Sequence, residues 1–341
     1  MKQHLIFLLL LLLSQNIIAQ KHTFQAPKMG TLIQVTIADQ DSLTAFNAAQ
    51  EVFHLYDTLN QILSDYLPDS ELNQLCKKAG TGEWMQVSPH LLHILQLSQV
   101  AYKQSNGAFD PSMGSLVQLW RTTRKTKKFP DKKSLVEALQ TKGFQLGKNI
   151  EIIENQVRLN RKKVQLDFGG IAKGYAAQCA VDRLKESGIN NVLIDSGGDL
   201  TVGDTPKNTQ GWKIAINHPN DAGEPLPYYL EVVNCSIATS GSLYQSVEIN
   251  KKHYSHIINP TTGIGLTHQK NVTILAKDGA TADWLATACS VLSIKKAKRL
   301  IYKVNKNIKT PESPSRLFIT YWYRGKIKTE KIGDFKWISL N

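Results

Sequence analysis

Cysteine is scarce in this chain, and its few cysteines are scattered. Cys76, Cys179, Cys235 and Cys289 are the four cysteines, and no two of them have the C-x-x-C spacing. This pattern argues against a zinc site or a dithiol redox motif. One or two disulfides remain open if the chain works in an oxidising compartment. Cys179 and Cys289 fall on the expected buried faces of two helices, which favours their interpretation as small buried hydrophobic residues.

Long apolar runs are also absent beyond the first residues. The chain starts with Lys2 and an apolar run from Leu5 to Leu13, which is short for a bilayer span, and Ala19 offers a cleavage point before Gln20. We therefore predict a secretion signal over residues 1–19 and a single exported domain over residues 20–341, with an uncleaved anchor as the alternative. No later run approaches the ~18 residues of a transmembrane helix, so we expect no stable membrane insertion after signal cleavage. The expected location is periplasmic, and association with the inner membrane is left open.

Acidic residues are too few to balance the basic ones. The chain has 28 Asp and Glu against 41 Lys and Arg, a formal net charge of +13. Such an excess suits an anionic ligand or a membrane-facing surface. Much of it lies in one polar stretch that contains Arg121, Arg124, Lys125, Lys127, Lys128, Lys132 and Lys133. We find no aromatic interleaving or nucleic-acid motif there, so we interpret the stretch as a solvated loop without assigned function and expect no nucleic-acid partner.

Hydrophobic periodicity predicts a mixture of helices and short strands. A long helix begins near Ser42, because Val52, Leu55, Leu59 and Ile62 recur at three- and four-residue steps. Further helices are predicted over Leu91–Ser105, Ser134–Lys142, Ala172–Ser187 and Thr281–Leu292. Strands are predicted over Gly30–Ala38, Ile150–Ile153, Val157–Leu159, Val164–Phe168, Asn191–Asp195, Trp212–Asn217, Tyr229–Val233 and Val272–Ala276, with a hairpin of Leu317–Tyr323 and Lys326–Ile332. Helices combined with mostly antiparallel strands indicate an α+β fold.

The segment from Leu166 to Tyr175 combines a carboxylate, glycines and a lysine at the junction of a strand and a helix. Asp167 ends the predicted strand, Gly169 and Gly170 allow a ligand to approach the backbone, and Lys173 stands at the start of the helix with its free N–H groups. This combination fits a phosphate or an adenine-ribose group. A Gly-Gly turn with a purely structural role is the alternative.

A second segment, from Asp278 to Thr287, places an acidic residue and a hydroxyl on one helical face. Asp283 and Thr287 are four residues apart, so a helix brings their side chains together. Hard oxygen ligands of this kind suit Mg²⁺, which completes its coordination with phosphate and water. The alternative is that Asp283 only interacts with the helix N-terminus while Thr287 points at a carbonyl.

Two shorter segments add a histidine and a third carboxylate. His256 lies where a strand breaks into the turn that ends at Gly263, and a histidine there could act as a general base toward an acceptor hydroxyl. A structural histidine remains the alternative. Asp110 follows Ala108 and Phe109 in a turn after a helix. On its own that turn is only a helix stop followed by a loop.

Taken together, the segments resemble the ApbE family of FAD:protein FMN transferases. The matching stretches follow in order along most of the mature chain: Met29–Thr31, Ser64–Tyr66 with Ser70–Leu72, Gly107–Pro111, Asp167–Tyr175, Asn191–Asp199, Ala238–Gly241, His256–Gly263 and the pair Asp283 and Thr287. The resemblance implies an ApbE-like, T-fold-like arrangement of mostly antiparallel sheets with packed helices and an FAD cleft. It departs at Gly170, where many relatives have alanine or threonine, a change that a carbonyl ligand tolerates.

The resemblance also implies roles for individual residues. FAD, as substrate, would be held by Met29, Tyr66, Ala108, Phe109, Asp110, Asp167, Lys173 and Ile258. Mg²⁺ would be bound by Asp283, Thr287 and the carbonyl of Gly170, and His256 would deprotonate the acceptor. Catalysis would thus centre on His256 and Asp283.

The reaction implied by the resemblance is the cleavage of FAD, with FMN attached through a phosphoester to a Thr or Ser of an extracytoplasmic acceptor protein and AMP released. Two alternatives use the same residues. An FAD pyrophosphatase would pass the phosphoryl group to water, and a non-catalytic flavin-binding protein would keep FAD intact.

Overall fold

A computed structural model describes residues 20–145, 147–216, 226, 228–241, 246–306 and 314–339. The predicted secretion signal, residues 1–19, lies outside the described residues. Within them, no helix is both long and apolar enough to cross a membrane.

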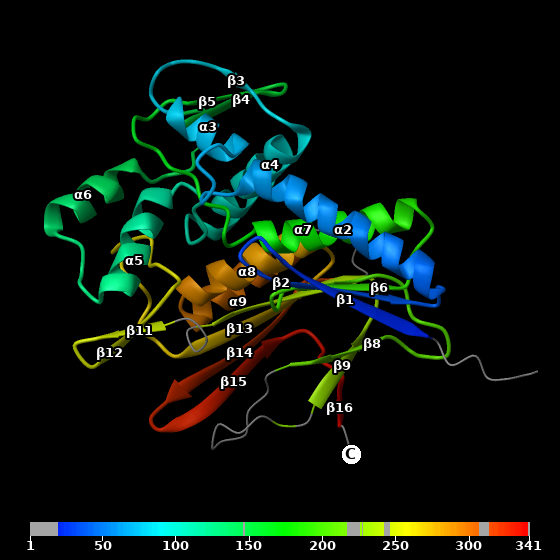
Figure 1. Ribbon diagram of the computed structural model, residues 1–341. Helices are drawn as coiled ribbons and strands as arrows, with labels where there is room; N and C mark the ends of the chain where they lie inside the picture. The colour runs from blue at the N-terminus through cyan, green and yellow to red at the C-terminus, as the bar shows by residue number, and fades with distance from the viewer. Residues whose placement is uncertain are drawn as a thin grey trace, which may run out of the picture.

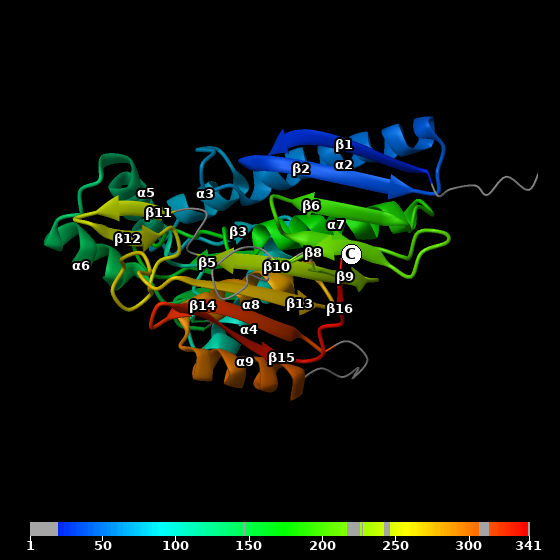
Figure 2. The same cartoon turned by 90° about the horizontal axis from the view of Figure 1, so that it is seen from below.

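One large sheet organises the molecule (Figures 1 and 2). Its eight strands follow the order β1-β2-β6-β7-β10-β13-β14-β15, and every neighbouring pair is antiparallel. They are β1 (Lys21–Lys28), β2 (Thr31–Ala38), β6 (Val192–Ser196), β7 (Leu200–Val202), β10 (Cys235–Gly241), β13 (Lys270–Ala276), β14 (Arg316–Tyr323) and β15 (Lys326–Ile332). Met29 and Gly30 join β1 to β2 with φ angles of 47° and 72°, as a two-residue turn of left-handed conformation requires.

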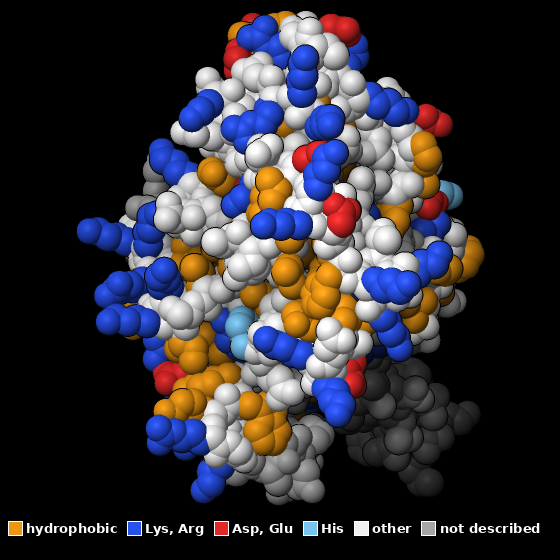
Figure 3. All heavy atoms as spheres, turned by 90° about the vertical axis from the view of Figure 1, so that its left-hand side faces the viewer, with side chains coloured by type: hydrophobic (Ala, Val, Ile, Leu, Met, Phe, Trp, Pro, Cys, Tyr) orange, Lys and Arg blue, Asp and Glu red, His pale blue; other side chains and the backbone are white. Residues whose placement is uncertain are grey.

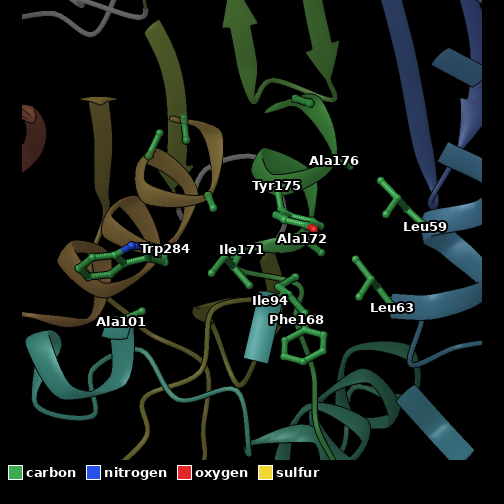
Figure 4. Packing of buried hydrophobic residues seen from close by; sticks show 14 of the residues in the cluster. Leu59, Leu63, Ile94, Ala101, Phe168, Ile171, Ala172, Tyr175, Ala176 and Trp284 are labelled. Carbon is green, nitrogen blue, oxygen red and sulfur yellow. The ribbon is translucent and has the colours of Figure 1, made fainter. Parts of the chain in front are cut away.

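Helices cover one face of this sheet (Figure 1). They are α2 (Ser42–Leu63), α7 (Ala172–Glu186), α8 (Gly279–Val291) and α9 (Ile294–Lys306), and α4 (Pro89–Ser105) packs on them from outside. Helix α2 starts where the Asp41 carboxylate accepts the N–H groups of Leu43 and Thr44, which are otherwise without partners in a first turn. Figure 4 shows the core between these helices, in which Tyr175 and Ile94 lie between Trp284 on one side and Leu59 and Leu63 on the other.

The other face of the sheet is covered by a smaller one. Strands β8 (Trp212–Ala215), β9 (Tyr228–Val232) and β16 (Trp337–Ser339) form this sheet in the order β16-β9-β8. Its Trp212, Ile214 and Leu230 pack against Ile237 and Phe318 of the large sheet in a second core. The large sheet is thus buried on both faces over this region, which keeps its strands in place.

A lobe stands at one end of the sheet. Helices α5 (Gly114–Thr126) and α6 (Lys132–Thr141) pack there against the hairpin of β11 (Ser246–Ile249) and β12 (Lys252–Ser255) around a third core. Beside the helices, α3 (Glu71–Lys77) and a small sheet of β3 (Met85–Gln86), β5 (Gln156–Leu159) and β4 (Ile150–Ile153) complete the molecule. The lobe supplies one wall of the site described below.

The α+β class and most elements are confirmed, since the predicted long helix, the helices near 91–105, 134–142, 172–187 and 281–292 and the final hairpin all form. The prediction of a strand over Val164–Phe168 is wrong. Only Gln165 makes an isolated bridge, to Met113, because the other backbone groups bond elsewhere: the N–H of Asp167 donates to the carbonyl of Pro111 at 2.8 Å. Apart from this bridge, the segment has no strand paired beside it.

Two further expectations are corrected. The basic stretch from Arg121 is not a solvated loop, because α5 runs to Thr126 and α6 starts at Lys132; Leu116, Trp120 and Thr123 recur at helical spacing and are buried. The possible disulfides also do not form, since all four cysteines are free thiols. Cys289 is fully buried, in agreement with its interpretation as a small hydrophobic residue, whereas Cys179 is only partly buried.

Candidate active site

A cavity of about 1020 Å³ opens between the start of α7, the middle of α8, the ends of the central strands and the lobe. All the predicted site residues line it: Met29, Tyr66, Ala108, Phe109, Asp110, Asp167, Gly170, Lys173, His256, Ile258, Asp283 and Thr287. Their positions span the chain from the first hairpin to the penultimate helix. The volume lies at the upper end of the range for small-molecule sites, as a dinucleotide would require. The structure brings these residues together, and their individual roles stay predictions.

Asp283 sits where helices α7 and α8 come closest. A Cβ atom added at Gly174 would lie 2.1 Å from the carbonyl oxygen of Gly279, so only glycine allows this approach. The carboxylate Oδ2 of Asp283 accepts the N–H of Gly174 at 3.1 Å and so caps the first turn of α7. The Asp283 side chain therefore interacts with a helix N-terminus, as the structural alternative supposed, but with that of the neighbouring helix, and it also faces the cavity.

Three ionisable groups lie together beside this cap: the buried Asp283 and Asp199, and the partly buried Lys173. The ammonium of Lys173 lies 2.5 Å from Oδ2 of Asp199, whose residue is 5% exposed. Burial, and after it the nearby Asp199 carboxylate, raise the pKa of Asp283 to about 8, while Lys173 opposes the shift. Burial lowers the pKa of Lys173, but Asp199 and Asp283 outweigh it, so the pKa is raised and the lysine stays charged. The cluster holds one carboxyl more than it has cations, and a cation next to Asp283 would remove that imbalance.

Oxygen donors for such a cation lie beside Asp283. Thr287 follows one turn later on α8, and its Oγ1 would come within 2.8 Å of a Cβ at Gly170. Thr287 makes no side-chain hydrogen bond within the described part of the chain, so the carbonyl contact of the structural alternative does not form there. No group of three or more His, Cys, Asp or Glu able to hold a metal occurs among the described residues. A dedicated protein cage is therefore absent there, while one carboxylate with a hydroxyl and a carbonyl fits Mg²⁺ that shares a substrate phosphate.

A second, partly buried network surrounds Asp167. Arg121 of α5 forms ion pairs with Asp65 and, at 3.1 Å, with Oδ2 of Asp167, and its guanidinium lies 3.9 Å from the centre of the Tyr66 ring. Asp167 Oδ1 accepts the N–H of Gly169 at 2.7 Å. Burial and then the Asp65 carboxylate raise the pKa of Asp167 to about 6, with Arg121 opposing. Arg121 thus fixes a carboxylate and an exposed aromatic ring on the same wall of the cavity.

His256 is positioned by the lobe. Strand β12 ends at Ser255, and the indole Nε1 of the buried Trp120 donates to the Ser255 carbonyl at 2.8 Å. The chain then turns, with an isolated bridge between Ile258 and Gly265 and a hydrogen bond from the Gly263 N–H to the Asn259 carbonyl. His256 therefore faces the cavity from the end of a strand that α5 holds in place.

The turn after α4 supplies the remaining wall. Asn106 takes a left-handed conformation that ends the helix, and the N–H of Phe109 donates to Oγ of Ser105 at 3.0 Å. Asp110 accepts the N–H of Ser112 at 2.9 Å, and burial raises its pKa against the effect of that bond. These contacts hold Ala108, Phe109 and Asp110 on the cavity surface.

Sequence reasoning missed four residues of the site. Asp199 could have been found, because it follows Gly197-Gly198 at a strand end much as Asp167 precedes Gly169-Gly170. Arg121 and Trp120 were hidden in the basic stretch, and the carboxylates that Arg121 binds are 56 and 46 positions away. Asp65 lies in the matching stretch Ser64–Tyr66, but no role was predicted for it.

Comparisons with known proteins identify the family to which the chain belongs. The model of the ApbE family matches residues 29–310. An FAD:protein FMN transferase of Treponema pallidum is 32% identical over 287 residues, which are 80% of this chain and 79% of that protein. One of Vibrio cholerae is 29% identical over 277 residues, or 80% and 82% of the two chains.

Solved structures are similar as well. The flavin transferase ApbE from Vibrio cholerae has a TM-score of 0.80 at 25% identity and covers 93% of this chain and 99% of its own. The Pseudomonas stutzeri flavinyl transferase ApbE in its apo form has a TM-score of 0.78 at 23% identity, covers 93% and 96%, and shows the same fold.

Proposed function

The chain belongs to the ApbE family and is a transferase enzyme, and from that premise we propose that it cleaves FAD and attaches the FMN half to a Thr or Ser of an acceptor protein, with release of AMP. One observation carries the proposal: twelve residues predicted for this chemistry from scattered segments line a single cavity. The relatives named as FAD:protein FMN transferases support the same reaction.

The cavity offers FAD both charge and apolar surface. Lys173 and the start of α7 stand ready for the pyrophosphate, because helix N-termini and lysines favour phosphate oxygens. Met29, Tyr66 and Phe109, which line the cavity, can contact the rings of the ligand. Asp110 and Asp167 are hydrogen-bonded carboxylates that can accept from its hydroxyl or N–H groups.

Asp283, Thr287 and the carbonyl of Gly170 would hold Mg²⁺. When bound, the ion would neutralise charge on the pyrophosphate and on the Asp283 carboxylate. The fit rests on the buried Asp283 with its raised pKa and on the Thr287 hydroxyl that lies beside Gly170.

In the transfer step, the acceptor hydroxyl oxygen forms a bond to the phosphorus that carries riboflavin. The bond from that phosphorus to the bridging oxygen breaks, and AMP leaves with the bridging oxygen. The proton of the hydroxyl passes to a ring nitrogen of His256, because imidazole side chains can take up a proton in this way near neutral pH. Lys173 stays cationic and stabilises the charge that develops on the phosphate oxygens.

We also propose that the protein acts outside the cytoplasm, on an extracytoplasmic acceptor. The charged start, the apolar run and Ala19 support export with cleavage before Gln20. Fractionation of expressing cells, with N-terminal sequencing of the mature protein, tests this. A cytoplasmic protein that still begins at Met1 would contradict it.

The function itself is tested with purified protein, FAD, MgCl₂ and a flavin-acceptor domain. We expect a fluorescent band that survives denaturing electrophoresis and one AMP for each FMN attached. Omission of MgCl₂ with a chelator present should stop both. Free FMN in place of labelled acceptor would show hydrolysis, and intact FAD after long incubation would show a binding protein.

A further inference from the structure

A second, smaller hollow adjoins the cavity on the lobe. It encloses about 530 Å³ and is lined by Arg121, Arg124, Lys125, Lys127, Ser246, Val247 and Glu248, a set that we call the basic hollow. The cations come from the last turns of α5, where Lys127 ends the helix in a left-handed conformation, and the other wall comes from β11. Figure 3 shows this end of the molecule, with many Lys and Arg side chains and few acidic ones.

The cations of the basic hollow are not used to stabilise the fold by ion pairs. Arg121 is paired with Asp65 and Asp167, but Arg124, Lys125 and Lys127 form no salt bridge with any carboxylate of the described residues. A helix C-terminus favours a nearby cation, yet that effect is small and fades within the last turn. The helix C-terminus therefore does not explain why three cations surround one hollow. The exposed Lys128, Lys132 and Lys133 extend this positively charged surface.

One carboxylate opposes this charge. Glu248 lines the hollow and is exposed, and its Oε2 lies 3.7 Å from Nε2 of His253 across the β11–β12 hairpin. A single exposed carboxylate leaves the hollow with an excess of positive charge. The expected ligand is therefore anionic.

The position of the hollow restricts the ligand further. Arg121 and Arg124 line both the basic hollow and the main cavity, so the two spaces meet at these side chains. His256, the proposed base, faces the same cavity from the end of β12, in the hairpin that forms the other wall of the hollow. A hydroxyl that reaches His256 on a polypeptide must bring its neighbouring residues with it, and an extended chain advances about 3.3 Å per residue.

We propose that the basic hollow binds an acidic segment of the acceptor protein, within a few residues of the Thr or Ser that receives FMN. This inference rests on the proposed function, since it names the partner of that site. A concave hollow beside the cavity suits a polypeptide better than a planar membrane surface, which would contact protruding residues. Attraction at such a rim acts mainly on the association rate and falls with salt.

The test uses two labelled peptides of equal length with a central Thr, one flanked by Asp and Glu and the other by Asn and Gln. Their binding to the full mature chain is followed by fluorescence anisotropy at low and at physiological salt. We expect the acidic peptide to bind about tenfold more tightly at low salt, with the preference shrinking as salt screens the charges. Equal binding of both peptides, or binding of neither, would overturn the proposal.

A charge-neutralised variant locates the effect. Lys125→Gln, Lys127→Gln and Lys128→Gln together should remove most of the preference. The matched control, Lys295→Gln, Lys296→Gln and Lys306→Gln, removes the same charge from exposed positions of α9 and should keep it. Equal loss in both variants would show a general effect of net charge and refute the site.

Two further arms separate the remaining outcomes. The first arm measures binding to vesicles of phosphatidylcholine and phosphatidylglycerol. If the vesicles bind the wild type but not the triple-Gln variant, and both peptides bind equally, the basic hollow is a membrane-binding surface and the proposal is overturned. FMN transfer to a flavin-acceptor domain is measured in parallel. If the variant with Lys125→Gln, Lys127→Gln and Lys128→Gln transfers FMN at the wild-type rate when the acceptor is limiting, the proposed acidic segment is refuted and the proposed function stands. If the wild type transfers no FMN at all, the proposed function is refuted.

Discussion

The close contact of α7 with α8 at Gly174 gives the sharpest prediction from the structure. In Gly174→Ala, the new methyl group would lie 2.1 Å from the Gly279 carbonyl oxygen and 2.8 Å from Cβ of Asp283. Ordinary contacts of carbon with a carbonyl oxygen exceed ~3.3 Å, so the helices must separate by about 1 Å. Overpacking of this kind costs about 1–3 kcal/mol, and the better helix propensity of alanine returns up to about 1 kcal/mol.

We therefore expect Gly174→Ala to lower the free energy of unfolding by about 2 kcal/mol, which for a chain of this length lowers Tm by about 3 °C. The displacement also moves Asp283, and a misplacement of about 1 Å in an active site can slow a reaction by about 100-fold. Thermal unfolding and FMN transfer are the assays. Asp182→Ala, on the exposed side of the same helix, should leave both within about 0.5 kcal/mol of wild type. A Gly174→Ala protein with wild-type stability and activity would refute the proposed contact between the helices.

Further predictions concern the lobe and its contacts. Arg121→Met should weaken FAD binding, since it releases Tyr66 and leaves two carboxylates without their cation. Because the pKa of Asp167 in the folded wild type is already raised to about 6 from 3.8, the folded state binds the extra proton and its stability falls as the pH rises from about 4 to about 6. In Arg121→Met that pKa rises further, so the difference in Tm from wild type should grow between pH 5 and pH 8; a difference independent of pH would contradict the role of the ion pair. Trp120→Phe removes the indole N–H that donates to the Ser255 carbonyl, which should cost about 1–3 kcal/mol of stability and slow transfer more than it weakens FAD binding. Equal effects on binding and transfer would contradict the positioning of His256 by the lobe.

Much of the fold could be predicted because local patterns agree with the final packing. The helical spacing of Val52 and Leu59 is the spacing of the buried face of α2, and Arg324-Gly325 is the turn of the final hairpin. Val164–Phe168 has the composition of a strand but lacks a neighbour, and no local pattern reveals a missing neighbour. The helix over Arg121 was hidden for the opposite reason, because its charges concealed the buried spacing of Leu116 and Trp120.

The site residues also fall into those that a local sequence pattern reveals and those that it does not. Glycine and carboxylate pairs at element ends, as at Asp167 and Gly170, marked most of the cavity wall. The residues that hold those groups in place could not be found, because Arg121, Trp120 and Asp199 act through partners far away in the chain. Their contacts exist only once the lobe packs against the sheet.

Asp283→Asn tests the central claim most directly. Asparagine keeps the shape and an oxygen for the Gly174 N–H, and burial already holds the pKa of Asp283 at about 8, so a neutral side chain at pH 7 should change the stability of the free protein by less than about 0.5 kcal/mol. FMN transfer from FAD to an acceptor domain in MgCl₂ should nevertheless fall by at least about 100-fold, because the carboxylate charge is lost from the proposed metal position. A folded Asp283→Asn protein that transfers FMN at the wild-type rate would contradict the account.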